Sequence, residues 1–86
     1  MTATLPIRVT VLDTWEEIRF SAPVSTLVTD IKRDALTKAR VVGAPEKWLV
    51  KYRGAEVPED GTTLEQAGIE PNGALIVLRR GRQPIR

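Results

Sequence analysis

Two pairs of adjacent carboxylates, Glu16-Glu17 and Glu59-Asp60, are the side chains in this sequence best suited to acid–base chemistry. General acid–base or nucleophilic catalysis usually relies on a histidine, a cysteine or a carboxylate held in a cleft. The 86 residues include no cysteine and no histidine, which excludes disulfides, thiol nucleophiles and nearly all zinc sites. Both carboxylate pairs fall in segments that we expect to be solvated turns. We therefore predict that the protein is not an enzyme and has no metal site and no cofactor.

A second chemically suggestive segment follows the last apolar run, where Arg79, Arg80, Arg82 and Arg86 surround a single glycine, Gly81. The four arginines contribute more positive charge than the net charge of +2 that the whole sequence carries. The remaining residues are therefore mildly acidic. Such a tail either contacts an acidic surface or is simply solvated, as chain ends commonly are. It has no aromatic residue for base stacking, so we expect no specific nucleic-acid binding. Arg79, Arg80 and Arg82 remain candidate contacts to a protein.

Length and composition limit the sequence to one small domain. With 42% hydrophobic and 28% charged residues, the chain is sufficient for one core. Its apolar runs are far shorter than the roughly 20 residues that cross a bilayer, and residues 1–6 lack the apolar centre of a signal peptide. We expect a cytoplasmic protein with one domain over residues 1–80 and a flexible basic tail over residues 81–86.

Alternation of apolar and polar residues predicts four strands, at residues 7–11, 18–21, 48–52 and 74–78. The five residues between the first two strands suit a hairpin. Residues 55–57 are expected to form a short return strand. After it, Thr62 or Thr63 should open a brief helical turn that Gly68 ends.

A single helix is predicted between residues 23 and 39. Its apolar residues recur at intervals of four and should form one stripe facing the sheet: Leu27, Ile31, Ala35 and Ala39. Ser25 or Thr26 is expected to cap the first turn with its hydroxyl group. At the other end, Gly43 is expected to adopt a left-handed backbone conformation, and Pro45 prevents the helix from continuing.

The two tryptophans have different expected roles. Trp48 is in phase with Val50 on the third strand, so we predict that it is buried in the core. Trp15 lies beside the hairpin turn, and two interpretations stay open for it. It either packs over the sheet edge or forms an exposed anchor for a partner.

The order of these elements predicts an α+β domain, in which one helix packs across one face of a mixed sheet of four to five strands. The last strand is apolar on both faces, with Leu75 and Val77 on one side and Ile76 and Leu78 on the other. Because the helix covers one face, the other face is either exposed or covered by a partner.

The second half of the sequence resembles the ubiquitin-like, or β-grasp, family. The matching motifs occur in the family's order: Tyr52-Arg-Gly54, Pro58-Glu-Asp-Gly61, Thr63-Leu64, Ala67-Gly68-Ile69, and Asn72 to Arg80. The first hairpin and the helix are similar in pattern, so the resemblance extends over residues 6–80. It implies a β-grasp fold. Small bacterial ubiquitin-like proteins of type VII secretion loci look similar over residues 67–75.

The resemblance also implies a partner-binding surface. Ubiquitin-like proteins dock partners on the outward faces of the third and last strands, and the matching positions here are Leu49, Lys51, Ile76 and Leu78. Lys51 replaces the central aliphatic residue, although a lysine stem can still lie flat in an apolar contact. We expect a protein partner on this face. The alternative is an ordinary solvated face with scattered aliphatic side chains.

The segment after the last strand departs from the modifiers of the family, which end in Gly-Gly. Here Gly81 is followed by Arg82-Gln-Pro-Ile-Arg86. We therefore expect an interaction module, an adaptor or accessory factor, that is not conjugated to other proteins. The alternative is a protein modifier that becomes conjugated after trimming at Gly81. In that case its partners include a trimming protease and activating and conjugating enzymes.

Overall fold

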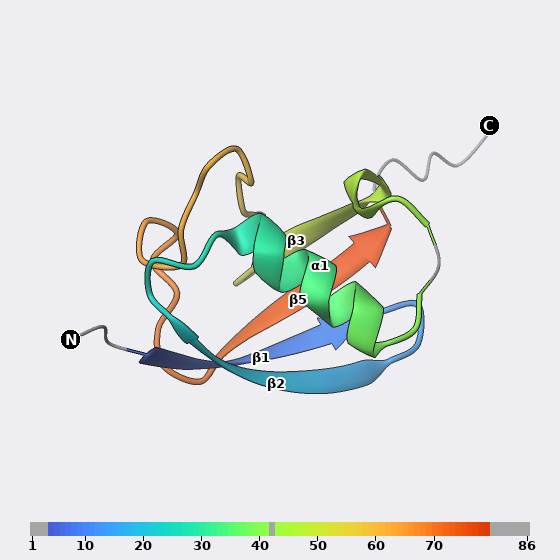
Figure 1. The fold of residues 1–86 in the computed structure, drawn as a ribbon, viewed down its shortest axis with the longest axis horizontal. Coiled ribbons are helices and arrows are strands. Elements are labelled where there is room, and N and C mark those ends of the chain that lie inside the picture. The colour runs from blue at the N-terminus through green and yellow to red at the C-terminus, as the bar shows by residue number, and fades with distance from the viewer. Residues whose placement is uncertain (1–3, 42, 80–86) are drawn as a thin grey trace.

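The structure is a computed structural model that describes residues 4–41 and 43–79. Its elements are, in chain order, β1 (Thr4–Val11), β2 (Glu16–Pro23), α1 (Val28–Lys38), the 3-10 helix η1 (Pro45–Lys47), β3 (Trp48–Tyr52), β4 (Ala55–Glu56) and β5 (Gly73–Arg79). Figure 1 shows α1 lying across one face of a twisted sheet. The α+β class and the ubiquitin-like β-grasp arrangement predicted from the sequence are confirmed.

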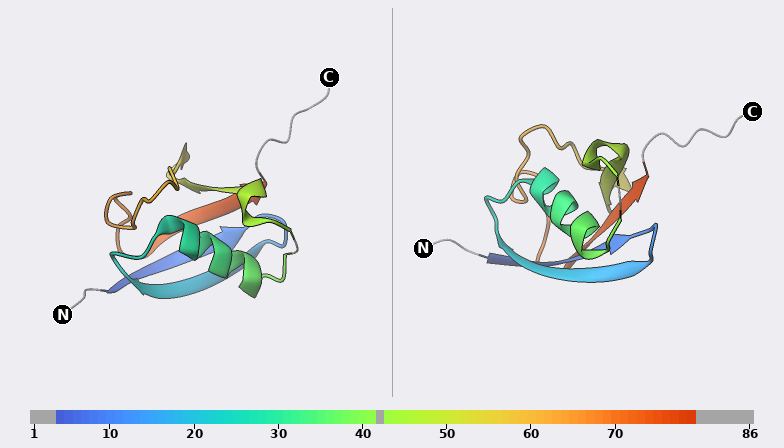
Figure 2. Two further views of the ribbon diagram at one scale, coloured as in Figure 1. Left: turned by 45° about the horizontal axis from the view of Figure 1, so that its top comes forward. Right: turned by 45° about the vertical axis from the view of Figure 1, so that its right-hand side comes forward.

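The five strands form one mixed sheet in the order β2-β1-β5-β3-β4. β1 and β5 run parallel and side by side, while the other neighbouring pairs are antiparallel. The two further views in Figure 2 show the same layering, with α1 on one side of the sheet. β5 is therefore an internal strand with both of its edges paired, and β2 and β4 form the edges of the sheet.

The core lies between α1 and the sheet. Alternate side chains of β1 and β5 are buried, as are apolar residues of α1: Ile7, Val9, Val11, Leu75, Val77, Val28, Ile31, Ala35 and Leu36. Trp48 is 0% exposed, which confirms its predicted place in the core. Each fully buried large side chain stabilises the fold by about 1.5–3 kcal/mol relative to exposure. Within the described residues, no helix is both long and apolar enough to cross a lipid bilayer.

The helix begins later than predicted, and neither Ser25 nor Thr26 caps it. Leu27 is the N-cap residue, and no side chain in the described chain caps this end. Instead, the Val28 amide donates to the Thr62 carbonyl at 2.9 Å. A loop distant in sequence thus satisfies a helical amide that has no partner within the helix.

The helix ends at an arginine in the left-handed conformation. Arg40 has φ 60, and the Val41 amide donates to the Leu36 carbonyl at 3.0 Å, as in a Schellman motif. Gly43 also has a positive φ, of 136, but it lies beyond this motif. A Cβ atom at Gly43 would lie 2.9 Å from Cη2 of Trp48, so the absent side chain makes room for the buried indole.

Thr63, rather than Thr62, opens the predicted turn before Gly68. The Gln66 amide donates to Thr63 Oγ1, and the Thr63 amide donates to Gln66 Oε1, both at 3.1 Å. This reciprocal capping box holds Leu64, which is 0% exposed, in the core. Gly68 follows with φ 75, so a glycine fits where the turn ends.

Candidate functional site

The face of the sheet opposite α1 carries the four residues that the sequence singled out. The antiparallel register of β3 and β5 pairs Leu49 with Leu78 and Lys51 with Ile76. Side chains directly opposite one another on one face have Cβ atoms about 4.5–5.5 Å apart. The register therefore assembles Leu49, Lys51, Ile76 and Leu78 into one two-by-two block, which we call the quartet.

The quartet is partly accessible to solvent. Ile76 is 40% exposed, while Leu49, Lys51 and Leu78 are partly buried. Their neighbours on β3 and β5, Val50 and Val77, are buried against the core, so alternation along each strand separates the two faces. The quartet is thus an accessible group of mostly apolar side chains on internal strands that hydrogen bonds hold in place.

Three residues that were not predicted to belong to this face lie in one row with Lys51 and Ile76. Thr10 of β1 lies beside Ile76 in the parallel register, and Glu56 of β4 lies opposite Lys51. Glu17 of β2 in turn lies opposite Thr10, so one row runs across all five strands. The pairing partner of a strand residue is set by the sheet register, which the sequence does not reveal, so this row could not have been found from alternation alone.

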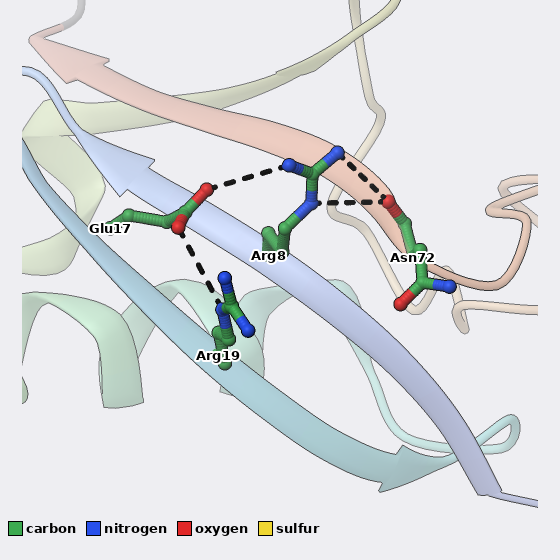
Figure 3. Close-up of polar contacts among 4 residues, drawn as sticks. All are labelled: Arg8, Glu17, Arg19 and Asn72. Atoms are coloured by element: carbon green, nitrogen blue, oxygen red, sulfur yellow. Dashed lines mark hydrogen bonds and ion pairs between the residues drawn. The ribbon is translucent and has the colours of Figure 1, made fainter.

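A polar cluster lies on the β1–β2 side of this face (Figure 3). Arg8 donates through Nε and Nη2 to the Asn72 carbonyl, at 3.3 and 3.2 Å, and its Nη1 lies 3.6 Å from Glu17 Oε2. Arg19 Nε lies 3.8 Å from the other oxygen of Glu17. All three charged side chains are substantially exposed, so these ion pairs add little stability. They give the face a charged border in which the arginines already have partners.

Further paired charges lie around the other strands. Arg53 Nη2 is 3.0 Å from Glu70 Oε1, and its guanidinium lies 5.3 Å from the centre of the Tyr52 ring. The Glu70 amide donates to the Tyr52 hydroxyl at 3.2 Å, which fastens the loop before β5 to β3. Arg53 is therefore engaged within the domain, as Arg8 and Arg19 are.

The predicted tail contacts are only partly within the described chain. Arg79 belongs to β5, where its Nη2 lies 2.9 Å from Asp13 Oδ2 and its guanidinium lies 4.8 Å from the centre of the Trp48 ring. Arg80, Gly81 and Arg82 lie outside the described residues, so their roles as tail contacts and as a processing site stay predictions.

Trp15 is 76% exposed, which leaves the exposed-anchor interpretation of this residue and removes the one in which it packs over the sheet edge. It occupies the last position of the β1–β2 turn with φ 60, and its amide donates to the Val11 carbonyl at 2.7 Å. A bulky residue rarely adopts this backbone conformation. The turn therefore presents a large aromatic side chain to solvent.

The two carboxylate pairs were expected in solvated turns, and for Glu16, Glu17 and Glu59 the structure differs from this expectation. Glu16 and Glu17 lie in β2 rather than in the turn, because Val11 already pairs with Glu16 and the loop comprises only residues 12–15. Glu59 Oε1 lies 2.6 Å from Nζ of the buried Lys32. Among the described residues, no three Asp or Glu side chains lie close enough together to hold a metal ion.

The described strands and helix have the ubiquitin-like β-grasp arrangement, and comparison with solved structures agrees. The ubiquitin of Caldiarchaeum subterraneum superimposes with a TM-score of 0.77, covering 95% of this chain and 100% of that one at 12% identity. A de novo design based on ubiquitin gives 0.77 over 95% and 98% of the two chains at 21% identity. The ubiquitin-like domain of an Arabidopsis thaliana protein gives 0.74 over 98% and 85% at 13% identity.

The sequence itself matches no protein-family model and no curated protein. Identities of 12–21% to the solved structures establish the fold alone.

Proposed function

We propose that this chain is a ubiquitin-like protein–protein interaction module that docks its partner on the quartet. The observation that carries this proposal is the β3–β5 register, which gathers three aliphatic side chains and a lysine stem into one accessible block. A partner that covers this block removes apolar surface from water at about 25 cal/mol per Å².

The surroundings of the quartet also suit an interface. Its side chains stand on internal strands, so docking requires little ordering of the backbone, which reduces the entropic cost of association. The ion pairs of Arg8, Arg19 and Arg53 lie around it and leave a polar border. An apolar centre with a polar rim is the usual anatomy of a protein interface.

We further propose that the module acts without being conjugated to other proteins. Support comes from the residues that follow β5, Arg80-Gly81-Arg82, which present one glycine between two arginines instead of a glycine pair. Mass spectrometry of the protein from its native cells tests this proposal. Molecules that continue past Gly81 are expected. Molecules that end at Gly81 and are joined to lysines of other proteins would instead establish the modifier function.

Docking on the quartet is tested with the double variant Ile76→Glu/Leu78→Glu. The matched control is Ser21→Glu, since Ser21 is exposed on β2 at the far edge of the sheet. Circular dichroism confirms that both variants are folded. Cross-linking in native cells, quantified by mass spectrometry, should show partners that the control retains and the double variant loses. Equal retention of all partners by the two variants would refute docking on this face.

A further inference from the structure

The outer edge of β2 is open. No strand among residues 4–41 and 43–79 pairs with this edge, because β2 stands at one end of the strand order. Figure 1 shows β2 along the margin of the molecule. An edge strand directs a row of backbone amide and carbonyl groups outward, where they can pair with a strand of another chain. The edge of β2 is therefore a template on which a further strand can add.

The structure of β2 does little to prevent such pairing. Proteins protect edge strands by keeping them very short, by interrupting them with bulges, or by placing proline or charged side chains on them. The opposite edge strand, β4, has only two residues. By contrast, β2 has eight residues that all pair with β1 without a bulge, and its proline is its last residue, Pro23. The protection that remains is the charge of exposed residues, among them Glu17 and Arg19 on the open face of the sheet.

These two charges have opposite signs, which makes the edge complementary to itself. If two copies of β2 lie antiparallel about a two-fold axis at Ile18, Glu17 of each copy lies opposite Arg19 of the other copy. An axis at Glu17 would place the two Glu17 residues opposite each other, and an axis at Arg19 would oppose the two arginines. Like charges directly opposite one another are destabilising. An axis at Phe20 would form no charge pair, so the charges favour the axis at Ile18.

The ion pairs within one chain leave room for this contact. Glu17 lies 3.6 Å from Arg8 Nη1 and 3.8 Å from Arg19 Nε. Both distances exceed the roughly 2.7–3.2 Å of a hydrogen bond. Residues two apart on one strand are separated by about 6.6–6.8 Å, whereas directly opposite residues have Cβ atoms about 4.5–5.5 Å apart. Arg19, whose side chain is 78% exposed, can therefore approach the carboxylate of a second copy more closely than its own. Arg8 keeps its bonds to the Asn72 carbonyl.

The other face of β2 supplies an apolar centre. Ile18 and Phe20 are partly buried and pack against the core. With the axis at Ile18, the two Ile18 side chains lie directly opposite each other, as in the β-branched cross-strand pairs that stabilise sheets. Phe20 of each copy lies opposite Glu16 of the other, and Glu16 is exposed, so its carboxylate can remain in water. The same register thus joins apolar side chains on one face and opposite charges on the other.

We infer that two copies of this chain associate through the outer edges of their β2 strands, antiparallel and with the two-fold axis at Ile18. Residues 16–20 of each copy form the ladder, and the sheet continues from one copy into the other. The quartet stands on β3 and β5, so both quartets stay accessible in this dimer. The association is therefore separate from the docking proposed above and is tested separately.

Sedimentation velocity and amide shifts of the full-length protein test the association. Sedimentation between about 10 µM and 1 mM should show a monomer that becomes a dimer as concentration rises. Dilution of the ¹⁵N-labelled protein over the same range should shift the amides of residues 16–20 most. A protein that is still monomeric at the highest concentration would overturn the inference, and so would shifts that centre on another part of the chain.

Two charge variants test the register. Glu17→Arg and Arg19→Glu each place like charges opposite one another in the dimer, so each should weaken self-association by at least roughly tenfold. An equimolar mixture of the two variants should dimerise again, because every pair in the mixed dimer joins opposite charges. Circular dichroism confirms that both variants are folded, and the control Arg33→Glu, on an exposed residue of α1, should dimerise as the unmodified protein does. Undiminished dimerisation of either variant, or a mixture that stays monomeric, would refute the register at Ile18.

Discussion

Replacing Lys32 with methionine should lower the free energy of unfolding by about 3 kcal/mol. Lys32 is 3% exposed, and its Nζ donates to the Trp48 carbonyl at 3.0 Å and pairs with Glu59 Oε1 at 2.6 Å. Removing one member of a buried ion pair costs about 3–5 kcal/mol, because the other charge stays in the core without the partner that offset its lost hydration. The Glu59 side chain is 15% exposed and retains some access to water, so we expect the lower end of this range.

The choice of methionine isolates the charge from the packing. Methionine fills a volume similar to that of lysine, so the variant leaves no large cavity beneath α1. For a domain of this size, about 3 kcal/mol corresponds to a fall in Tm of roughly 12–24 °C. Urea denaturation followed by far-ultraviolet circular dichroism measures the free energy, and a thermal melt measures Tm. The exposed residue Lys38 provides the control, since Lys38→Met should change stability by about 0.5 kcal/mol at most.

A second variant separates loss of the ion pair from a simple packing defect. In Lys32→Met/Glu59→Gln, the carboxylate that has lost the Lys32 ammonium group is replaced by a neutral amide, so part of the lost stability should return. The reasoning is refuted if Lys32→Met costs less than about 1 kcal/mol. It also fails if the double variant is no more stable than the single one.

Three other substitutions follow from local geometry. Gly43→Ala should lower the free energy of unfolding by about 2 kcal/mol, because the new Cβ would lie 2.9 Å from the Trp48 ring in a backbone with φ 136. Urea denaturation measures this loss, and an unchanged midpoint would contradict it. Trp15→Gly should leave Tm unchanged or raise stability by up to about 1 kcal/mol, since glycine adopts φ 60 without backbone strain and the side chain that is lost is exposed. A lower Tm would show that the indole stabilises the fold. Thr63→Ala should cost about 1 kcal/mol through loss of the bond to the Gln66 amide, whereas Thr63→Ser should retain most of it in the same denaturation assay.

Alternation along the sequence predicted the strands well because each has one buried face. The first strand begins at Thr4, earlier than the predicted Ile7, and so includes Pro6. Proline lacks an amide proton and is tolerated where a strand has an unpaired side. β5 pairs with β1 from Ile7 onward, so this part of the ladder requires no amide proton from Pro6. The prediction of a strand start at Ile7 was therefore reasonable from the sequence and wrong in the structure.

The ends of the helix could not be predicted because their partners are distant or unusual. Local sequence favoured a hydroxyl cap at Ser25 or Thr26, but the Thr62 carbonyl receives the Val28 amide instead. Likewise, the left-handed residue that ends the helix is Arg40, whereas Gly43, which has the positive φ expected of it, lies beyond the motif. In both places, tertiary packing overrides the preferences of individual residues.

The candidate site shows the same division between local and long-range information. Alternation assigned Leu49 and Lys51 to one face of β3, and Ile76 and Leu78 to one face of β5. Alternation alone does not show that these faces coincide; the family resemblance implied it, and the register of β3 and β5 places the four residues together. The burial of Lys32 was not predicted either, because lysine is usually exposed and the carboxylate that compensates it comes from a distant loop.

The two lysines on opposite sides of the sheet obey one physical rule. Lys32 is buried by its own chain, and that chain supplies the Trp48 carbonyl and the Glu59 carboxylate to its ammonium group. Lys51 is partly buried on the open face, and docking would complete its burial. On that face Glu56 of β4 lies opposite Lys51 in the register, so a carboxylate of the same chain stands next to this lysine as well. Each lysine is thus placed near a carboxylate from a distant part of the chain, by a loop for Lys32 and by the sheet register for Lys51, and alternation along one strand reveals neither.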